Sequence, residues 1–196
     1  MSAFFPIFLD LAAGRAMEHV LPNATAGDRS AQNEAEGELV GAIRHCLPPA
    51  PAVRRRRIEF RSQQAILCGY LFSAPQETTS SGTLPPVVVL THGFSATQSM
   101  GLTRTAECIC TRTGCAALTF DHKGFGESGG PRHHFCRWTQ CVAYLDAVTY
   151  LVECEKHTVD VERVVLWGES ASSRLVFVAG AIEPRVCCNP PSILML

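Results

Sequence analysis

Three apolar runs of four to six residues, at 87–90, 115–120 and 164–167, divide the middle of the chain. Runs of this length with little polar alternation are typical of strands covered on both faces, as in a parallel sheet between two layers of helices. The intervals hold helical patterns at 100–113 and 137–155, and in the second interval apolar residues recur every three or four positions. Strands that alternate with helices in this way predict a three-layer α/β fold with a mostly parallel sheet.

Two shorter strands and a proline-rich linker precede this pattern. Residues 58–60 alternate between apolar and polar, residues 65–72 are largely apolar, and the polar residues between them predict a turn. The prolines just upstream can neither continue a helix nor pair inside a sheet. We therefore divide the chain into a poorly ordered extension and linker at 1–53, a partial α/β domain at 54–186 and a divergent tail at 187–196.

Charge and composition argue against several classes of partner. The chain has 17 basic and 18 acidic residues and a formal net charge of −1, so no global field predicts binding to nucleic acid or to an anionic membrane. No apolar run reaches the roughly 20 residues that a membrane-spanning helix needs. The apolar N-terminus lacks an early Lys or Arg and is interrupted by Asp10, which argues against a secretory signal.

The ten cysteines indicate reduced thiols rather than a metal site. No pair has the C-x-x-C spacing, and several, such as Cys68 and Cys115, fall where a buried apolar residue is expected. Free cysteine behaves as a small hydrophobic residue in such positions. We therefore expect a cytoplasmic protein without a metal or another cofactor.

The first candidate for chemistry is Thr91-His92-Gly93-Phe94, directly after the strand at 87–90. A glycine at the end of a parallel strand lets the backbone turn sharply, and ligands in such folds bind at the carboxyl ends of the strands. The backbone N–H of Phe94 is therefore expected to face a developing oxyanion. A tight strand-to-loop turn without a catalytic role is the competing interpretation.

The second candidate is the stretch at 121–130, which follows the next apolar run and has four glycines in seven positions. Its spacing fits neither a phosphate loop nor, cleanly, the G-x-G-x-x-G dinucleotide motif. Asp121 and His122 look like a catalytic pair, but adjacent residues on an extended chain point in opposite directions. Structural support of the loop is the interpretation that we prefer for both.

The third candidate is Gly168-Glu169-Ser170-Ala171-Ser172, between the last apolar run and a small apolar helical stretch. This is the context of strand, turn and helix in which G-x-S-x-G forms a nucleophile elbow. The residues two before and two after the serine must be small so that strand and helix can approach. Ser172 departs from the usual second glycine, but it is small enough to preserve the turn. Ser170 is then the expected nucleophile, and the Ala171 N–H is the expected second oxyanion donor.

As a set, the segments VVVLTHGF, LTFDHKGFGESGG and VVLWGESAS resemble the α/β-hydrolase superfamily. Within it they are most similar to the branch of serine aminopeptidases and dienelactone-hydrolase-like proteins, over residues 54–186. The resemblance implies Ser170 as the nucleophile and the N–H groups of Phe94 and Ala171 as the oxyanion hole. The residues that it implies as support of the elbow and its neighbouring loop are His92, Gly93, Gly168 and Ser172.

The acid and the base of a catalytic triad are missing from the expected place. In this fold they follow the serine in chain order, yet no histidine lies after position 157, and Glu183 is the only acid after Ser170. A serine hydroxyl without a base is a weak nucleophile. The strand at 164–167 is also expected to become a sheet edge, because Pro190-Pro191 cannot lie in a central strand. We therefore expect the N-terminal half of the fold, inactive as it stands.

The leading interpretation is a serine hydrolase that acts on a small-molecule ester, thioester or amide through an acyl-enzyme at Ser170. One alternative is a non-catalytic protein that keeps the scaffold for binding, and another is a truncated product without a function. An in-frame Asp and His further downstream would favour the hydrolase, whereas a second chain covering the sheet edge would favour binding. The sequence leaves the oligomeric state and the choice between ester and peptide open.

Overall fold

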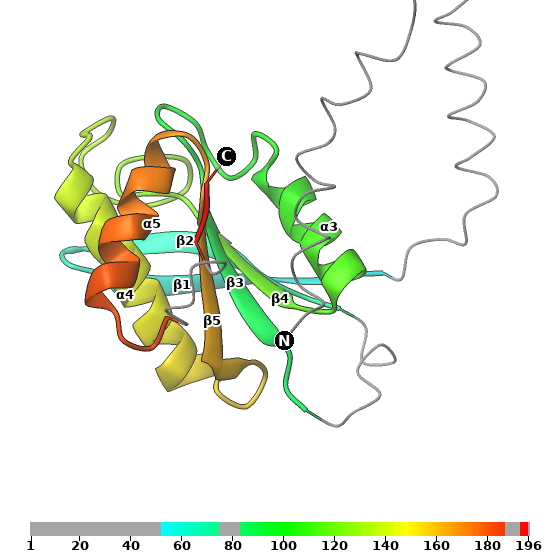
Figure 1. The fold of residues 1–196 in the computed structure, drawn as a ribbon. Coiled ribbons are helices and arrows are strands. Elements are labelled where there is room, and N and C mark those ends of the chain that lie inside the picture. Colours follow the sequence, from blue (N-terminus) through cyan, green and yellow to red (C-terminus); the bar gives the residue numbers. More distant parts are fainter. Residues whose placement is uncertain (1–51, 75–82, 187–192, 196) are drawn as a thin grey trace, which may run out of the picture. The chain divides into compact units, whose positions relative to one another are not determined.

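The computed structural model describes residues 52–74, 83–186 and 193–195, which build a sheet flanked by helices (Figure 1). The strands are β1 (Arg54–Ser62), β2 (Ala65–Ser73), β3 (Pro86–Thr91), β4 (Ala116–Phe120), β5 (Asp160–Gly168) and β6 (Ile193–Met195). The helices are α3 (Leu102–Thr113), α4 (Arg137–Tyr150) and α5 (Ala171–Ile182), and a π-helical turn (Leu151–Glu155) continues α4. The expectations for residues 1–51 and for most of the tail lie outside the described residues, so the division of the chain stays a prediction.

The sheet is mostly parallel, as the sequence predicts. In the described part of the chain its strand order is β1-β2-β4-β3-β5-β6. β1 and β2 form an antiparallel hairpin, and β2 also runs antiparallel to β4. β4, β3, β5 and β6 run parallel to one another, which brings the carboxyl ends of the central strands to one edge of the sheet.

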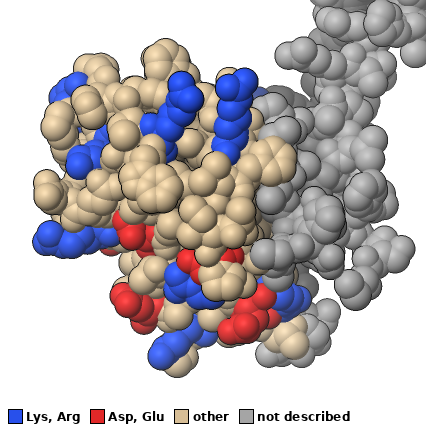
Figure 2. All heavy atoms as spheres, turned by 60° about the vertical axis from the view of Figure 1, so that its left-hand side comes forward, with Lys and Arg blue, Asp and Glu red and all other residues tan. Residues whose placement is uncertain are grey.

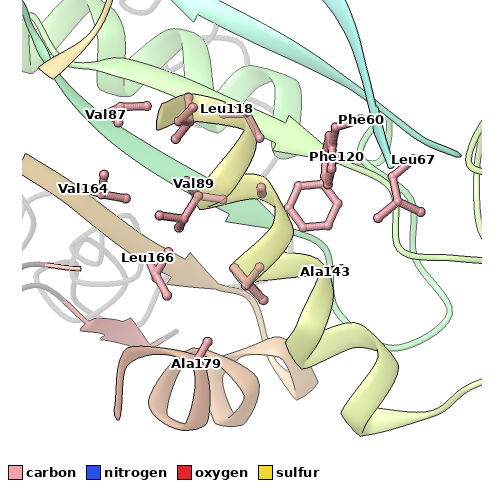
Figure 3. Close-up of a cluster of buried hydrophobic side chains, with 14 of the residues drawn as sticks. Phe60, Leu67, Val87, Val89, Leu118, Phe120, Ala143, Val164, Leu166 and Ala179 are labelled. Carbon is pink, nitrogen blue, oxygen red and sulfur yellow. The ribbon is translucent and has the colours of Figure 1, made fainter. Parts of the chain in front are cut away.

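Alternate residues of the central strands face opposite helical layers. In β3, Val87 and Val89 belong to the core shared with α4 and α5, whereas Val88 and Leu90 belong to the core shared with α3. Figure 3 shows the first of these cores, whose further labelled members are Phe60, Leu67, Leu118, Phe120, Ala143, Val164, Leu166 and Ala179. Because both faces are buried, the strands have continuous apolar runs instead of an alternating pattern. The three-layer α/β prediction is confirmed.

The structure corrects the expectation that the strand at 164–167 forms a sheet edge. β6 pairs in parallel with β5, and Leu166 lies opposite Ile193. The prolines misled the prediction because the strand β6 begins only after Pro190-Pro191. Its residues can therefore donate the backbone hydrogen bonds that a proline could not. In the described residues, β5 therefore has a neighbour on both sides where the serine turn begins.

The helix expected at 137–155 changes its geometry near its end. The α-helix stops at Tyr150, and the π-helical turn that follows ends at the buried Glu155. The carboxylate of Glu155 accepts hydrogen bonds from Arg56 at 2.6 Å, from Tyr150 at 2.8 Å and from Thr158 at 2.8 Å. Against the opposing effect of burial, these bonds hold the pKa of Glu155 below its usual value. The turn thereby ties the strand β1 to the end of α4.

Helix α5 is apolar on two sides. Leu175, Val176 and Ala179 are buried against the sheet, whereas Phe177 and Val178 are about half exposed. On the face drawn in Figure 2, uncharged side chains and a few Lys and Arg side chains fill the upper half, whereas Asp and Glu lie next to Lys and Arg in the lower half. No described helix combines the length and the apolar character that crossing a bilayer requires. The described residues thus leave part of an apolar helix surface uncovered.

Candidate active site

Ser170 stands on the sharp turn between β5 and α5. Its backbone angles are φ 51° and ψ −112°, which a residue other than glycine rarely adopts, and its side chain is exposed. Strain of this kind costs about 1–3 kcal/mol and persists where the surrounding structure enforces it. A Cβ at Gly168 would lie only 2.4 Å from the carbonyl oxygen of Ser172. The turn thus depends on a glycine where strand and helix approach each other.

The loop after β3 packs against this turn. A Cβ at Gly93 would lie 3.2 Å from the Ser170 Cβ and 3.3 Å from the carbonyl oxygen of Glu169. The N–H of Glu169 also donates to the carbonyl oxygen of Thr91 at 3.3 Å. The structure therefore brings together the two segments in which the sequence placed its nucleophile and its oxyanion loop.

Two backbone N–H groups next to these residues are unpaired. Phe94 follows Gly93 and Ala171 follows Ser170, and within the described part of the chain neither N–H donates to a protein acceptor. The Ser170 hydroxyl has no hydrogen-bond partner among the described residues either, whereas the Ser170 carbonyl accepts from the N–H and the hydroxyl of Ser173. One hydroxyl and two donors are thus available to a ligand.

Ser172, which replaces the usual second glycine of the motif, is buried and makes two side-chain hydrogen bonds. Its Oγ lies 2.6 Å from the carbonyl oxygen of His92 and 3.1 Å from Nε2 of His122. Because a carbonyl can only accept, the hydroxyl proton goes to His92, and Nε2 of His122 must carry the proton of the second bond. Sequence analysis noted only the small size of Ser172, but its hydroxyl joins α5 to the loops after β3 and β4.

His92 carries its proton on Nδ1, whereas His122 carries it on Nε2. Its Nε2 accepts the N–H of His122 at 3.1 Å, and its Nδ1 donates to the carbonyl oxygen of Gly93 at 2.9 Å. A carboxylate oxygen of Asp121 lies 3.7 Å from the same Nε2, too far for a hydrogen bond. Burial lowers the pKa of His92, and burial next to that ring lowers the pKa of His122 well below its usual value. Among the described residues, no three His, Cys, Asp or Glu side chains are grouped as a metal site requires.

Asp121 anchors the loop after β4. Its carboxylate accepts the backbone N–H of Gln98 at 2.7 Å, the side-chain amide of Gln98 at 2.9 Å and the N–H of Glu127 at 3.1 Å. Its carbonyl oxygen accepts the hydroxyl of Ser128 at 2.6 Å. Asp121 and the adjacent His122 thus reach different partners, as expected for neighbours on an extended chain. The sequence did not predict the role of Gln98, because this residue lies in an irregular loop and belongs to no motif.

A tyrosine of α4 joins the two strands directly behind the site. The hydroxyl of Tyr144 donates to the carbonyl oxygen of Trp167 at 2.9 Å and accepts the hydroxyl of Thr91 at 2.5 Å. Burial raises the pKa of Tyr144, so the phenol stays neutral. Thr91 and Trp167 directly precede His92 and Gly168. Sequence analysis missed this tyrosine because its position on the apolar face of the helix is typical of a core residue.

Aromatic side chains lie at and near the loop after β3. The ring of Phe94 is 62% exposed and meets the ring of Phe135 edge to face, with 5.0 Å between the centroids. Trp138, in the first turn of α4 and three residues after Phe135, is also mostly exposed. The side chain that accompanies the unpaired Phe94 N–H is therefore part of an apolar surface.

The strand order and the position of Ser170 define the class of protein. A mostly parallel sheet, a strained serine after the strand β5 and a glycine loop from the neighbouring strand β3 are the architecture of an α/β hydrolase. The family model described as serine aminopeptidase, S33, matches residues 84–190, which is more than half of the chain. The chain belongs to this family.

Three relatives illustrate the similarity. The chain is 31% identical over 144 residues to a thiohydrolase of Eupenicillium brefeldianum, covering 72% of this chain and 44% of the relative. It is 32% identical over 130 residues to the quorum-quenching protein AidA of Acinetobacter baumannii, covering 66% and 40%. The crystal structure of the α/β hydrolase GrgF from Penicillium sp. sh18 superimposes with a TM-score of 0.60 and 27% identity, covering 68% and 43%. The chain thus spans less than half of the length of each of these relatives.

Proposed function

We propose that this chain carries the nucleophile and the oxyanion hole of a serine hydrolase that acts on small-molecule acyl compounds. The backbone of Ser170 carries the proposal: a non-glycine residue held at φ 51° presents an exposed hydroxyl next to Gly93 and the unpaired N–H groups of Phe94 and Ala171. A packed fold retains such a strained conformation where it serves a function.

In the proposed reaction, the Ser170 Oγ forms a bond to the carbonyl carbon of the substrate while a general base accepts the hydroxyl proton. The carbonyl oxygen becomes an oxyanion, and the N–H groups of Phe94 and Ala171 stabilise it. When the C=O bond re-forms, the alkoxide, thiolate or amine leaves with the proton. Water then repeats the same steps on the acyl-enzyme, releasing the carboxylic acid and regenerating the serine.

The general base of this reaction is neither of the two buried histidines. Both ring nitrogens of His92 are used in hydrogen bonds, and Nε2 of His122 donates to Ser172. The remaining nitrogen of His122 is buried, so it cannot take a proton from an exposed hydroxyl. His157 lies three residues before the strand β5, at the opposite end of that strand from Ser170. The proposal therefore needs a base from outside this network.

Among acyl compounds, a thioester with an apolar acyl group fits the proposal best. The exposed ring of Phe94 and the half-buried ring of Phe135 against it provide an apolar contact at the proposed oxyanion donor. One relative is a thiohydrolase by name, which favours a thioester over an amide as the substrate of this chain. Esters remain useful test substrates because the same steps cleave them.

A non-catalytic binding function is the second candidate. The observation in its favour is that the Ser170 hydroxyl has no hydrogen-bonded base among the described residues, although the remainder of the turn is well formed. In that case the two free N–H groups would hold a carboxylate or carbonyl ligand without forming a covalent bond.

Covalent labelling tests the proposed reaction. The whole chain is incubated with a fluorescent fluorophosphonate, and hydrolysis of a p-nitrophenyl ester and of an acyl thioester is measured on the same sample. We expect slow labelling on the peptide that contains Ser170, driven by the two N–H donors without a base, and its complete loss in Ser170→Ala. The matched control is Ser99→Ala, because Ser99 is an exposed serine whose hydroxyl bonds to the Thr97 hydroxyl at 2.9 Å and lies outside the proposed site.

Each outcome decides between the two candidates. Labelling that disappears in Ser170→Ala and persists in Ser99→Ala supports the nucleophile. A wild-type chain that binds a fatty acid, as detected by calorimetry, but is not labelled supports the binding function instead. Equal labelling of the wild type and of Ser170→Ala would refute the role of Ser170.

A further inference from the structure

We infer that the buried chain of Ser172, His122 and His92 positions the peptide bond between Gly93 and Phe94, so that the Phe94 N–H points to the substrate side of Ser170. This inference rests on the proposed function in one respect, namely that this N–H is an oxyanion donor. It assigns a positioning role to the hydroxyl of Ser172 and to the tautomers of both histidines.

The peptide bond between Gly93 and Phe94 is fixed by the hydrogen bonds of its carbonyl oxygen. In a trans peptide the C=O and the N–H point in opposite directions, so that fixing one fixes the other. The carbonyl oxygen of Gly93 accepts Nδ1–H of its neighbour His92 at 2.9 Å and the N–H of Ala96 at 3.3 Å. Both donors hold this oxygen on the protein side of the loop. The Phe94 N–H of the same peptide must therefore point away from them.

The hydrogen bond to the Gly93 carbonyl depends on the tautomer of the His92 ring. His92 can donate through Nδ1 as a neutral ring only if its Nε2 is unprotonated. The backbone N–H of His122 donates to that Nε2 at 3.1 Å and thereby selects the required tautomer. If His92 carried its proton on Nε2 instead, that N–H would face the backbone N–H of His122. The Gly93 carbonyl oxygen would then lose the 2.9 Å hydrogen bond from Nδ1.

The ring pair is connected to the elbow helix by Ser172. The Ser172 hydroxyl donates to the carbonyl oxygen of His92 at 2.6 Å, which fixes the peptide before Gly93. The same hydroxyl accepts Nε2–H of His122 at 3.1 Å and so fixes the orientation of that ring. All three side chains are almost completely buried, and water cannot replace these bonds easily. A glycine at 172 could make neither bond.

The unpaired ring nitrogen of His122 indicates that the ring is there for its other nitrogen. Its Nδ1 is buried and has no hydrogen-bond partner in the described part of the chain. An unpaired buried acceptor is unfavourable by about 1–3 kcal/mol, so a ring placed only to fill space would be better replaced by phenylalanine. Within the described part of the chain, the Nε2–H bond to Ser172 is the side-chain contact of this ring that requires a histidine.

Nuclear magnetic resonance on the whole chain tests the inference without relying on activity. Side-chain ¹⁵N shifts report which ring nitrogen of each histidine carries the proton. We expect the proton on Nδ1 of His92 and on Nε2 of His122 in the wild type. In Ser172→Ala and Ser172→Gly we expect the His122 signals to change to a tautomer mixture and the Phe94 amide signal to shift.

A kinetic measurement connects the network to the oxyanion hole. Removing one oxyanion donor typically costs about 10²–10³-fold in rate, so a misdirected Phe94 N–H in Ser172→Ala should slow fluorophosphonate labelling about 10–100-fold. The matched control is Ser128→Ala, because Ser128 is an equally buried serine with two hydrogen bonds, to Cys68 N–H and to Asp121 O. Ser128→Ala should lower the free energy of unfolding but leave the His92 and His122 tautomers and the labelling rate unchanged.

The two readouts separate the possible failures. If the wild type is not labelled, the proposed function fails, and the tautomers alone decide the inference. A proton on Nε2 of His92 in the wild type would overturn it. So would a Ser172→Ala variant in which the Phe94 amide and both histidines keep their wild-type signals, since Ser172 would then only fill space.

Discussion

The loops after β4 and β5 both follow a buried strand and both begin with residues of catalytic type, but they use them in opposite ways. Asp121 and His122 are buried and their polar atoms are engaged within the protein, apart from one ring nitrogen of His122. Ser170 is exposed and strained, and its hydroxyl has no hydrogen-bond partner among the described residues. The difference teaches that residue type alone is a weak indication of chemistry, and that an exposed, unsatisfied group held in an unfavourable conformation is a stronger one.

The comparison extends to the way in which each loop is stabilised. The loop after β4 is held by a carboxylate that collects three N–H donors, so its side chains stabilise it directly. The serine turn is held from outside, by the close approach of Gly168 and Gly93 and by the Ser172 hydroxyl. We therefore expect substitutions at Asp121 to affect stability and substitutions at Ser170 to affect chemistry.

The largest expected effect on stability comes from Asp121→Ala. The substitution removes the acceptor of the buried N–H and side-chain amide of Gln98 and of the part-buried N–H of Glu127, and we expect the free energy of unfolding to fall by about 3 kcal/mol. Urea unfolding followed by circular dichroism measures this change. A loss below about 1 kcal/mol would contradict the anchoring role of this carboxylate.

The same position tests the catalytic interpretation. Asp121→Asn keeps the size of the side chain and one acceptor oxygen, so the fold should survive. Loss of a catalytic base lowers a rate by about 10²–10⁴-fold, whereas loss of a loop anchor should leave fluorophosphonate labelling of the folded chain within about 3-fold. A larger loss in Asp121→Asn would erase the distinction between the two loops.

The second effect is a dependence of stability on pH that the buried histidines impose. The folded chain holds the pKa values of His92 and His122 below 6.5, the value of an exposed histidine, because of burial. Below pH 6.5 the unfolded chain therefore binds protons that the folded chain does not. The contribution of the two neutral histidines to the free energy of unfolding is fully present above pH 6.5. As the pH is lowered below 6.5, the free energy of unfolding should fall by up to ~1.4 kcal/mol per pH unit for each histidine.

Urea unfolding between about pH 7.5 and pH 5.5 measures this slope. The acidic groups Glu155 and Glu183 also have lowered pKa values, but their usual value is 4.5, so their contribution is lost only at lower pH. His122→Gln preserves an N–H donor to Ser172 and removes one titrating ring, and should reduce the slope by about half. An unchanged slope in this variant would show that other groups cause the pH dependence.

The sequence predicted the layers of this fold better than the contacts of its site. Apolar runs such as 87–90 and 164–167 specify strands because burial on both faces acts on each residue locally. The motif at 168–172 likewise predicted the turn, since the small size of Gly168 is a local requirement. The partners of Ser172 lie 80 and 50 residues away in the chain, at His92 and His122, and no periodicity reports on contacts over such separations.

Two deviations of the fold have similar causes. The π-helical turn after α4 was missed because the apolar pattern at 137–155 continues through it, while the buried Glu155 depends on Arg56, 99 residues earlier. The pairing of β6 with β5 was missed because Pro190-Pro191 argued against a strand next to the serine turn, whereas the strand begins just after them. In both cases the local pattern alone gave the wrong element, because a segment outside it (β1 for the π-helical turn, β6 for the edge of β5) determined the structure.

The smallest expected effect tests whether the serine turn is strained. In most positions glycine is less favourable than alanine by about 0.5–1 kcal/mol, because it loses more conformational freedom on folding. At φ 51° the order should invert, since an alanine keeps the unfavourable contact of Cβ with the backbone and glycine removes it. We therefore expect Ser170→Gly to unfold at a higher urea concentration than Ser170→Ala, by a difference of about 1 kcal/mol. The matched pair is Ser173→Gly and Ser173→Ala in α5, three residues on, where the ordinary order should hold. If glycine were the less stable residue at both positions, Ser170 would not be strained, and the strongest physical argument for its role would be lost even if fluorophosphonates label it.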